Sequence, residues 1–468
     1  MSSLAGRETR QMLAGLSRWL REESQARLVP TRLRVPLEKW TVAHAYPAAA
    51  APLRWTLSAE SSRAALLLGG DFALHQWRPG EVPGSAVSGL AALARTADVF
   101  ILNLESQLTS RSAPTGTIGT SMRAEPAAIA ELSYLGVKAV TCANNHCLDY
   151  GPDGLRESAE RLEQAGIAVA GVMGEGRDGG AVVSVGGIRV GLLGFSDDWR
   201  VADEAGGEVR PAPHDPALVR ERITAMKLAA DLVVVQLHWG YEWSVYPMLT
   251  LRNLARSYVE SGASLVVCHH AHVPMGVETW GGGAIAHGLG NLCFGPLQWA
   301  THPFWSSSYL LRAEISPTGV VALEAHPVVT DPEGRVGPDS GRSADTMRSV
   351  IAYLSSRLGH DDYLARVEAS ILARHGCGVL RDLHRRVQAG DSAGVRERVR
   401  FLEPPRQRAL LTSLRAAGGG LARIGDFFEQ LREGVVEATA ASTRAELERL
   451  NAWGARFLKR STQLGRIP

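Results

Sequence analysis

The sequence predicts an α/β sandwich with a mixed central sheet, and three features of residues 64–328 support this class. Short, β-branched apolar segments recur, as expected of strands that are buried on both faces. Amphipathic helical stretches separate most of these segments. Hairpins with glycine-containing turns follow toward the end of the region. Short buried strands that alternate with helices are typical of layered α/β domains.

The expected strands are the apolar runs. In chain order they read AALLLGG, DVFILNL, VKAVTC, IAVAGV, IRVGLLGF, DLVVVQL and ASLVVC. Helices are expected at residues 86–97, 126–136, 151–166 and 248–262, where apolar side chains recur every three or four positions. Two hairpins are expected at residues 276–291 and 308–328.

Changes in this pattern predict three regions. Residues 1–55 combine an N-terminal amphipathic helix with a Pro/Ala linker. Residues 56–338 form the α/β domain. Over residues 339–468 the strand-like segments give way to helical ones, which predicts a helical appendage. We expect this appendage to select substrate, to contact a partner or a second copy, or to close as a lid, and the sequence leaves these three roles open.

Composition excludes several classes of partner. The 468-residue chain has 50 basic and 48 acidic residues, and so lacks the single-sign field that binds nucleic acid or an anionic membrane. No segment resembles a signal peptide or a membrane span, so we expect no integral membrane segment. The five cysteines are widely spaced and include no C-x-x-C pair, which indicates reduced thiols rather than disulfides. These features predict a cytoplasmic protein.

Polar side chains gather where the predicted strands end. Carboxylates, carboxamides and imidazoles follow five of the strands, at Asp71, Asn103, Glu105, Asn144, Asn145, His146, Asp149, His238, Glu242, His269, His270 and His272. Because the carboxyl ends of strands in an open α/β sheet direct their loops into one crevice, we expect these side chains to converge. Oxygen and imidazole donors together are a ligand set for divalent metals. We therefore predict a metal site rather than five unrelated capping interactions.

Six motifs in a fixed order give these residues a family context. They read GGDF, NLES, ANNHCLDYGPDGL, HWGYEW, CHHAHVPMGVE and HGLGNLCFG over residues 64–328. In this order they resemble the CapA family of capsule and poly-γ-glutamate biosynthesis, within the calcineurin-like metallophosphoesterase superfamily. The resemblance covers somewhat over half of the chain. It implies a four-layer α/β/β/α sandwich with a metal site at the strand ends.

The resemblance also implies roles for individual side chains. The implied metal ligands are Asp71 and His272 at a first position, Glu105 as a bridge, and Asn145, His238 and His270 at a second position. His146 is then the catalytic imidazole that faces the substrate without binding metal, and Asp149 orients it. The implied cofactor is a divalent ion, one of Mn²⁺, Mg²⁺, Ca²⁺ or Zn²⁺.

One position departs from the family pattern. Many members of the superfamily carry Asp-x-His in the first motif, whereas DFALH places Ala73 where that histidine would be. His75 lies two residues further on, roughly 7 Å away along an extended strand, and we interpret it as a loop or surface histidine. Because a first position with fewer protein ligands binds its ion more weakly, we expect one tight ion and leave a second open.

Three functions remain open for such a site. The first is hydrolysis of a phosphoester or an amide in a peptide or polymer substrate, with His146 protonating the leaving group. The second is epimerisation of a peptide, as in lasso-peptide pathways, where histidines on either face exchange a Cα proton. The third is a non-catalytic accessory role in poly-γ-glutamate synthesis. A tryptophan rim would suit a peptide better than a bare phosphate, and its members are expected at Trp199, Trp239, Trp243, Trp280, Trp299 and Trp305.

Overall fold

The computed structural model describes residues 52–75, 84–115, 121–197, 209–294, 304–365, 367–368 and 371. The predicted N-terminal helix and most of the predicted linker lie outside these residues, as does the predicted appendage from residue 372 onward. Residues 47–361 form one compact unit. Both large sheets and the candidate site lie in the unit of residues 47–361.

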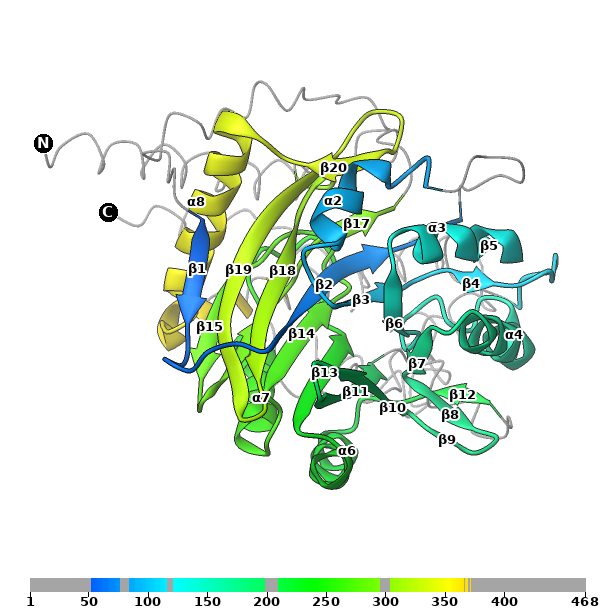
Figure 1. Cartoon of the computed structure of the whole chain (residues 1–468), viewed down its shortest axis with the longest axis horizontal. Coiled ribbons are helices and arrows are strands. Elements are labelled where there is room, and N and C mark those ends of the chain that lie inside the picture. The colour runs from blue at the N-terminus through cyan, green and yellow to red at the C-terminus, as the bar shows by residue number, and fades with distance from the viewer. Residues whose placement is uncertain are drawn as a thin grey trace, which may run out of the picture. The chain divides into compact units, whose positions relative to one another are not determined.

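A nine-stranded sheet contains the first strands of the domain (Figure 1). Its main path runs β1–β19–β18–β2–β3–β6–β7, while β17 pairs with β2 and β20 pairs with β19. Its strands are Leu53–Thr56 (β1), Ala64–Phe72 (β2), Val99–Leu104 (β3), Val137–Thr141 (β6), Ala168–Ala170 (β7), Asn291–Cys293 (β17), Ser307–Ser316 (β18), Gly319–Thr330 (β19) and Val336–Pro338 (β20). Because β2, β3, β6 and β7 pair in parallel, their carboxyl ends lie along one edge.

A six-stranded sheet is built from the later strands, in the order β10–β11–β13–β14–β16–β15. These strands are Gly180–Val185 (β10), Ile188–Ser196 (β11), Leu232–His238 (β13), Leu265–His269 (β14), Val277–Trp280 (β15) and Gly283–Ala286 (β16). The four central strands are parallel, and antiparallel hairpins form both edges. Two small sheets lie beside the large ones: β8 (Val172–Gly174), β9 (Arg177–Asp178) and β12 (Arg210–Pro211) form one, and β4 (Gln107–Leu108) and β5 (Arg123–Ala124) form the other.

Helices cover one face of the nine-stranded sheet. They are α2 (Ala91–Ala94), α3 (Ile129–Tyr134) and α4 (Gly151–Gln164), with the 3₁₀ turns η3 (Ser88–Leu90) and η4 (Pro126–Ala128). In α4, Leu155, Ala159 and Leu162 recur every three or four residues and are all buried. They pack in one hydrophobic cluster with Phe100 and Val140 of the sheet. The amphipathic pattern predicted for this segment thus faces the sheet.

The six-stranded sheet has its own helices, α6 (Pro216–Ala229) and α7 (Leu249–Glu260). The Asp215 carboxylate caps α6 by accepting hydrogen bonds from the N–H groups of Ala217 and Leu218, both at 2.9 Å. Ile223 of α6 and Tyr258 of α7 are fully buried in a second cluster with residues of β11, β13 and β14. Each large sheet therefore carries helices on one face.

The two sheets pack against each other through the faces that the helices do not cover. Leu66, Leu68 and Ile101 of the nine-stranded sheet are almost completely buried, although they lie outside its helix-facing cluster. Between the sheets, a Cβ added to Gly194 of β11 would lie 2.1 Å from Oγ1 of Thr141 in β6, so glycine is required there. The described residues thus form a mixed α/β structure with two large sheets, which confirms the predicted class.

Two boundaries differ from those predicted. β1 pairs with β19 from Leu53 onward, so the sheet begins three residues before the predicted start of the domain at residue 56. Helix α8 (Gly341–Arg357) contacts β15 of the six-stranded sheet and β19 of the nine-stranded sheet, and the N–H of Val277 in β15 donates a 2.9 Å hydrogen bond to Ser355 Oγ. α8 therefore belongs with the sheets rather than with a separate appendage.

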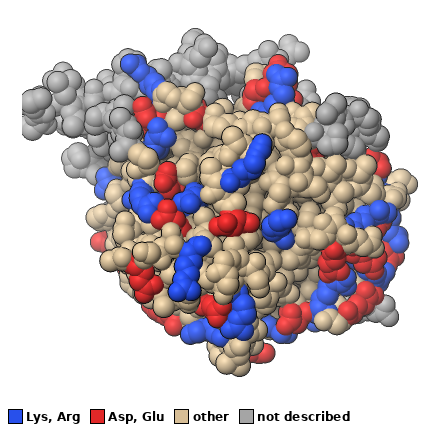
Figure 2. Space-filling view, viewed as in Figure 1, with Lys and Arg blue, Asp and Glu red and all other residues tan. Residues whose placement is uncertain are grey.

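Basic and acidic side chains are intermixed on the face of the molecule that Figure 2 shows. Ion pairs among the described residues include Arg189 with Asp231 at 2.8 Å and Arg54 with Glu314 at 2.6 Å. Within the described part of the chain, none of the helices combines the length and the apolar character that crossing a membrane requires.

Candidate metal centre

The nine-stranded sheet places oxygen donors at its carboxyl edge. Asp71 lies one residue before the end of β2, Glu105 directly follows β3, and Asn145 lies in the loop after β6. Asp71 and Glu105 are fully buried. A Cβ added to Gly70, next to Asp71, would lie 1.9 Å from the carbonyl oxygen of Gly290, so only glycine allows this close approach of the two chain segments.

The six-stranded sheet places imidazoles at the facing edge. His238 ends β13, while His270 and His272 follow β14, and all three are buried. The backbones of His270 and His272 have positive φ angles of 84° and 57°, a region that residues other than glycine rarely adopt. Strained backbone of this kind concentrates at functional sites.

Asn103 connects the two groups of donors. Its Nδ2 donates to Asp71 Oδ1 at 2.9 Å and to Glu105 Oε2 at 3.3 Å, and it lies 3.2 Å from Nδ1 of His238. The Asn103 side chain is in turn held by Asn144, whose Nδ2 donates to Asn103 Oδ1 at 3.3 Å. One carboxamide on β3 therefore orients two carboxylates and one imidazole.

The second predicted metal position is gathered around His238 Nε2. Asn145 Oδ1 lies 2.8 Å and His270 Nδ1 lies 3.1 Å from this atom. Glu105 Oε1 is 3.7 Å from it and also 3.7 Å from Nε2 of His272. Glu105 thus stands between the groups predicted for the two positions.

The first predicted position is gathered around Asp71. His272 Nδ1 lies 3.3 Å from Asp71 Oδ2, and the backbone N–H of His270 donates to the same oxygen at 3.2 Å. Asp71, Glu105, Asn145, His238, His270 and His272, the six predicted ligands, therefore lie in one contact network.

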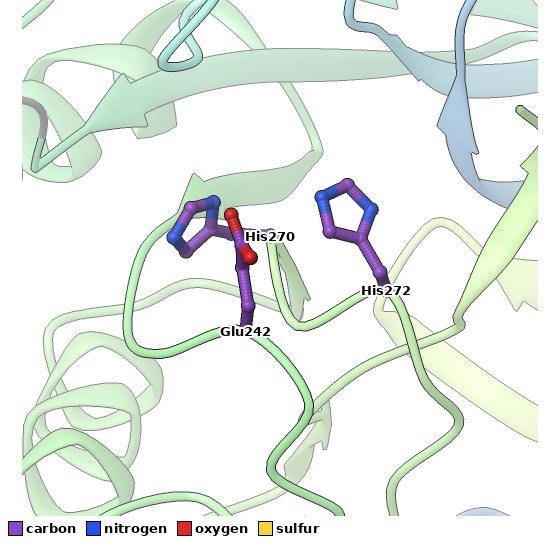
Figure 3. A group of neighbouring side chains, drawn as sticks. All are labelled: Glu242, His270 and His272. Carbon is purple, nitrogen blue, oxygen red and sulfur yellow. The ribbon is translucent and has the colours of Figure 1, made fainter. Parts of the chain in front are cut away.

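Two groups of three donors in this network are compact enough to hold an ion. Asp71, Glu105 and His238, which we call the inner triad, place their donor atoms within 4.8 Å of one another. Glu242, His270 and His272, the outer triad, do the same. Figure 3 shows the Glu242 carboxylate beside the ring of His270, with the ring of His272 on the other side of it. The inner triad is completely buried, whereas Glu242 is exposed.

The carboxylates of the inner triad have the electrostatics of a cation site. Burial raises the pKa of Glu105 well above its ordinary value, an effect that the positive charge of His272 opposes. Burial would also raise the pKa of Asp71, but hydrogen bonds to His269 and His272 outweigh it and hold this pKa well below the ordinary range. Within the described residues, Glu105 Oε1 is buried without a hydrogen-bond partner. A divalent ion would satisfy that oxygen and balance both carboxylates.

The imidazoles differ from one another in charge. Burial lowers the pKa of His238 well below its ordinary value, which keeps the ring neutral with a lone pair for a ligand. Burial also lowers the pKa of His272, but the charges of Glu105 and Asp71 dominate and raise it to about 10. A bound divalent ion would take the place of the His272 proton in balancing these carboxylates, and would leave the ring a lone pair for the ion. The donor set therefore fits a divalent metal.

The His146 loop lies beside these donors. His146 Nδ1 lies 2.8 Å from Asp149 Oδ2, and Asp149 also accepts a 2.7 Å hydrogen bond from the N–H of Met122. Gln107 fixes the same loop, because its Nε2 donates to the carbonyl oxygen of Cys147 at 2.7 Å and its Oε1 accepts from the N–H of Tyr150 at 2.6 Å. Asp149 thus holds Nδ1 of the His146 ring, while the catalytic roles that the resemblance implies for this pair stay a prediction.

Sequence reasoning did not assign several side chains that shape the centre. Oδ1 of Asn291, in β17, lies 2.8 Å from Nδ1 of His272. His269 lies between Asp71 Oδ1, at 3.2 Å, and Gln236 Oε1, also at 3.2 Å. A polar residue at the start of a strand, as in GLGNLC, is the signal that could have identified Asn291.

The neighbourhood of Ala73 is apolar. Ala73 is 2% exposed and packs in a small cluster with Met122, Phe294 and Trp305. His75, interpreted as a loop or surface histidine, is partly buried, with its ring 5.9 Å from that of Phe294. Burial, with a smaller contribution from the charge of His146, lowers the pKa of His75 to about 4. His75 therefore lies closer to the site than the sequence indicated.

The predicted tryptophan rim is present in part. Trp243 and Trp305 stack with ring centroids 5.0 Å apart, and Trp243 lies 5.5 Å from the ring of His272. Trp239 is instead buried beneath α7, and Trp280 lies under Arg256 on an exposed edge. Trp199 and Trp299 lie outside the described residues.

Comparison with known proteins identifies the domain that carries this centre. Residues 65–296 match the family model described as "Bacterial capsule synthesis protein PGA_cap". This part of the chain belongs to that family. The PGA_cap domain therefore contains all six predicted ligands as well as His146 and Asp149, in agreement with the CapA resemblance.

Curated relatives share this domain. The PGA biosynthesis protein CapA of Bacillus subtilis (strain 168) is 32% identical over 169 residues, which are 35% of this chain and 44% of that protein. The capsule biosynthesis protein CapA of Bacillus anthracis is 32% identical over 167 residues, 34% of this chain and 40% of that protein. The match thus spans less than half the length of either relative. A probable polyglutamine synthesis accessory protein of Mycobacterium tuberculosis (strain CDC 1551 / Oshkosh) is 26% identical over 289 residues, 58% of this chain and 76% of that protein.

Solved structures resemble the chain more distantly. A hypothetical protein from Thermus thermophilus aligns over 56% of this chain and 98% of its own, at 17% identity and a TM-score of 0.38. A 5'-nucleotidase from Candida albicans SC5314 aligns over 67% of this chain and 59% of its own, at 12% identity and a TM-score of 0.31. Scores this low do not support a fold assignment.

Proposed function

We propose that the PGA_cap domain is a metal-dependent hydrolase on a calcineurin-like four-layer sandwich, acting on a phosphoester or an amide of a peptide or polymer substrate. The observation that carries this proposal is the convergence of two buried carboxylates and three buried imidazoles beside the hydrogen-bonded pair His146–Asp149. Helices on one face of each packed sheet support the four-layer fold.

In this proposal the predicted ligands form one centre that holds at least one divalent ion. Asp71, Glu105, Asn145, His238, His270 and His272 supply carboxylate, amide and imidazole donors, a set that accommodates Mn²⁺, Mg²⁺, Ca²⁺ or Zn²⁺. When bound, such an ion supplies a Lewis acid that polarises a phosphoryl or carbonyl oxygen of the substrate. Through its three contacts, Asn103 holds the two carboxylates and His238 in fixed positions relative to one another.

His146 moves the proton in this reaction. Asp149 holds Nδ1 of the ring, so Nε2 is the atom that faces the substrate and protonates the leaving oxygen or nitrogen. Gln107 and the N–H of Met122 fix the loop and the carboxylate, so the ring is positioned before the substrate arrives.

The substrate class is proposed from the surroundings and from the relatives. Two relatives are named for the biosynthesis of a capsule or of PGA, which favours a polyglutamate-like chain, and the aromatic side chains next to His272 favour a peptide over a bare phosphate. We further propose a cytoplasmic location, because the five cysteines of the chain are widely spaced and include no C-x-x-C pair, as expected of a reducing compartment.

A second candidate, peptide epimerisation, is favoured by one specific observation. The ring of His75 lies 5.9 Å from that of Phe294, which lies 4.6 Å from that of His272, and neither His75 nor His146 belongs to either donor triad. A neutral imidazole at His75 could remove a Cα proton while His146, held by Asp149, returns one to the opposite face.

One experiment separates these functions. Metal-loaded protein is incubated in D₂O with γ-glutamyl oligomers, linear peptides and phosphoesters, and the products are analysed by mass spectrometry. Cleaved products or released phosphate support hydrolysis, and deuterium at one Cα without cleavage supports epimerisation. Metal binding without turnover of any substrate would contradict both and leave the accessory role.

A further inference from the structure

The carboxyl end of β2 offers no second ligand beside Asp71. Ala73, two residues after Asp71, packs among Met122, Phe294 and Trp305 and is 2% exposed. The ring of Phe294 lies 4.6 Å from that of His272, so this side of His272 faces carbon rather than a donor atom. Any further donor to an ion at His272 must come from another element.

Glu242 comes from such an element. It lies in the loop between β13 and α7, and its carboxylate oxygen lies within 4.8 Å of imidazole nitrogens of His270 and His272. Figure 3 shows this carboxylate and the two rings drawn from two different loops of the six-stranded sheet. Glu242 is therefore close enough to both rings to share an ion with them, although it is exposed.

The next residue fixes the Glu242 loop against the site. The N–H of Trp243 donates a 2.9 Å hydrogen bond to the carbonyl oxygen of Ala271, between the two outer histidines. The Trp243 ring stacks on Trp305, and its backbone has a positive φ of 67°. A tryptophan held in this strained conformation determines where the preceding side chain points.

A buried oxygen faces the same place. Glu105 Oε1 is completely buried, lies 3.7 Å from His272 Nε2 and has no hydrogen-bond partner among the described residues. Leaving such an oxygen without a partner is costly unless a cation satisfies it. The outer triad therefore has a buried oxygen beside it that a bound cation would satisfy.

We propose that Glu242, His270 and His272 hold a second, weaker ion, and that Glu242 supplies the ligand that the strand end at Ala73 lacks. This inference rests on the proposed metal-dependent function. Two imidazoles and one carboxylate are a ligand set typical of Zn²⁺, whereas the oxygen-rich inner triad also suits harder ions. Because Glu242 is exposed and the inner triad is buried, the outer ion is the one that exchanges faster.

The test is a zinc titration of the full-length protein after its metals have been removed with a chelator. Isothermal titration calorimetry of the wild type should show a tight and a weak binding event. Glu242→Gln should weaken the second event by about tenfold or more and leave the first unchanged. Glu221→Gln, an exposed glutamate of α6, is the matched control and should change neither. Thermal melting of each variant verifies that the fold is intact.

Two further variants sharpen the result. Glu242→His keeps a metal-binding side chain and should retain the weak event. Ala73→His combined with Glu242→Gln should restore it, provided that melting shows the buried substitution to be tolerated. A normal weak event in Glu242→Gln, or loss of the tight event as well, would overturn this assignment while leaving a metal centre in place. If the wild type bound none of Zn²⁺, Mn²⁺, Mg²⁺ and Ca²⁺ in parallel titrations, the proposed function itself would be overturned.

Discussion

The two sheets contribute different chemistry to the same site. The carboxyl edge of the nine-stranded sheet supplies mainly oxygen and amide donors, at Asp71, Asn103, Glu105, Asn145 and Asn291. The edge of the six-stranded sheet supplies mainly imidazoles, at His238, His269, His270 and His272. Each sheet alone would offer a partial donor set. The mixed set exists only because the two sheets are packed together.

Each edge also has one exception, and the exceptions are the more accessible residues. His146 is an imidazole on the oxygen side, and its side chain is 14% exposed, compared with 1% for His238. Glu242 is a carboxylate on the imidazole side and is exposed. Buried donors hold their positions through several contacts, whereas the accessible ones are free to meet substrate or an exchanging ion. The contrast therefore separates the buried donors from the accessible groups, which are His146 on the substrate side and Glu242 at the proposed exchanging ion.

The largest expected effect comes from removing the imidazole on the oxygen side. His146→Ala should lower turnover by about 10²- to 10⁴-fold, because a general acid is lost, while metal affinity stays within about threefold of the wild type. Activity assays and calorimetry on the same preparation measure both quantities. By contrast, His270→Ala, on the imidazole side, should lower metal affinity, and its turnover should fall as a consequence of the lost ion.

Asp149 provides the control for this assignment. Asp149→Asn keeps the shape of the side chain but removes the charge that orients Nδ1 of His146, so it should lower turnover less than His146→Ala does. If His146→Ala turned over at the wild-type rate, or lost its metal, the distinction between the two kinds of imidazole would be wrong.

The next effect tests the side chain that touches both edges. Asn103→Ala removes the amide that contacts Asp71, Glu105 and His238, so metal affinity should fall by about 10- to 100-fold. Calorimetric titration measures the change. Asn253→Ala, on the exposed side of α7, should leave the affinity unchanged. Equal affinities for Asn103→Ala and the wild type would show that the two donor groups are oriented independently.

Much of this fold could be predicted from local patterns. The apolar runs coincide with β2, β3, β6, β11, β13 and β14, and the segment of residues 151–166 contains α4. These elements were recognisable because buried parallel strands are apolar on both faces and amphipathic helices repeat every three to four residues. The division into two sheets could not be read from the runs, since pairing partners depend on contacts between distant residues.

The sequence was enough to predict which residues supply donor atoms at the site. It was not enough to predict which residues those donors contact. Strand-end positions identified Asp71, Glu105, His238 and the outer histidines, because parallel strands bring their ends together. Glu242 lies near His270 because of the path of the loop after β13. A backbone hydrogen bond from the N–H of Trp243 to the carbonyl oxygen of Ala271 fixes that path. A contact of this kind leaves no periodic pattern in the sequence.

A smaller effect is expected from pushing the sheets apart. Gly194→Ala would place a Cβ 2.1 Å from Thr141 Oγ1 and 3.1 Å from Gly171 Cα, so it should lower the free energy of unfolding by about 1–3 kcal/mol. Urea unfolding measures the loss. Gly319→Ala is the matched control, because a Cβ there meets nothing within 4 Å.

A double variant shows whether the contact between sheets is the cause. Thr141→Ala removes Oγ1, so Gly194→Ala should cost less in the Thr141→Ala background than in the wild type. Equal costs in both backgrounds would mean that Gly194→Ala acts through its own sheet and would weaken the picture of a site assembled by sheet packing.

The smallest effect concerns acid stability on the imidazole side. The ring of His214 packs 4.9 Å from that of Trp239, the residue directly after β13, and its Nε2 lies 2.7 Å from the hydroxyl of Tyr258 in α7. Burial lowers the pKa of His214 to about 4, whereas an unfolded histidine has a pKa of about 6.5. As the pH falls from about 6.5 to about 4, the unfolded chain therefore binds a proton that the folded chain does not bind. The free energy of unfolding falls over this window.

Replacing this histidine isolates its share of the acid sensitivity. His214→Gln keeps a hydrogen-bonding side chain next to Tyr258 but cannot titrate, so its stability should fall by about 1–2 kcal/mol less than that of the wild type between pH 7 and pH 5. Urea unfolding at pH 7, 6 and 5 measures the difference, with the exposed His360→Gln as the control that should follow the wild type. The comparison uses the change with pH rather than the absolute stability, because His75 and His238 also have lowered pKa values and contribute equally to both proteins. Parallel pH curves for His214→Gln and the wild type would show that His214 takes up its proton as readily in the folded chain as in the unfolded chain. Acid would then not destabilise the six-stranded sheet through this contact.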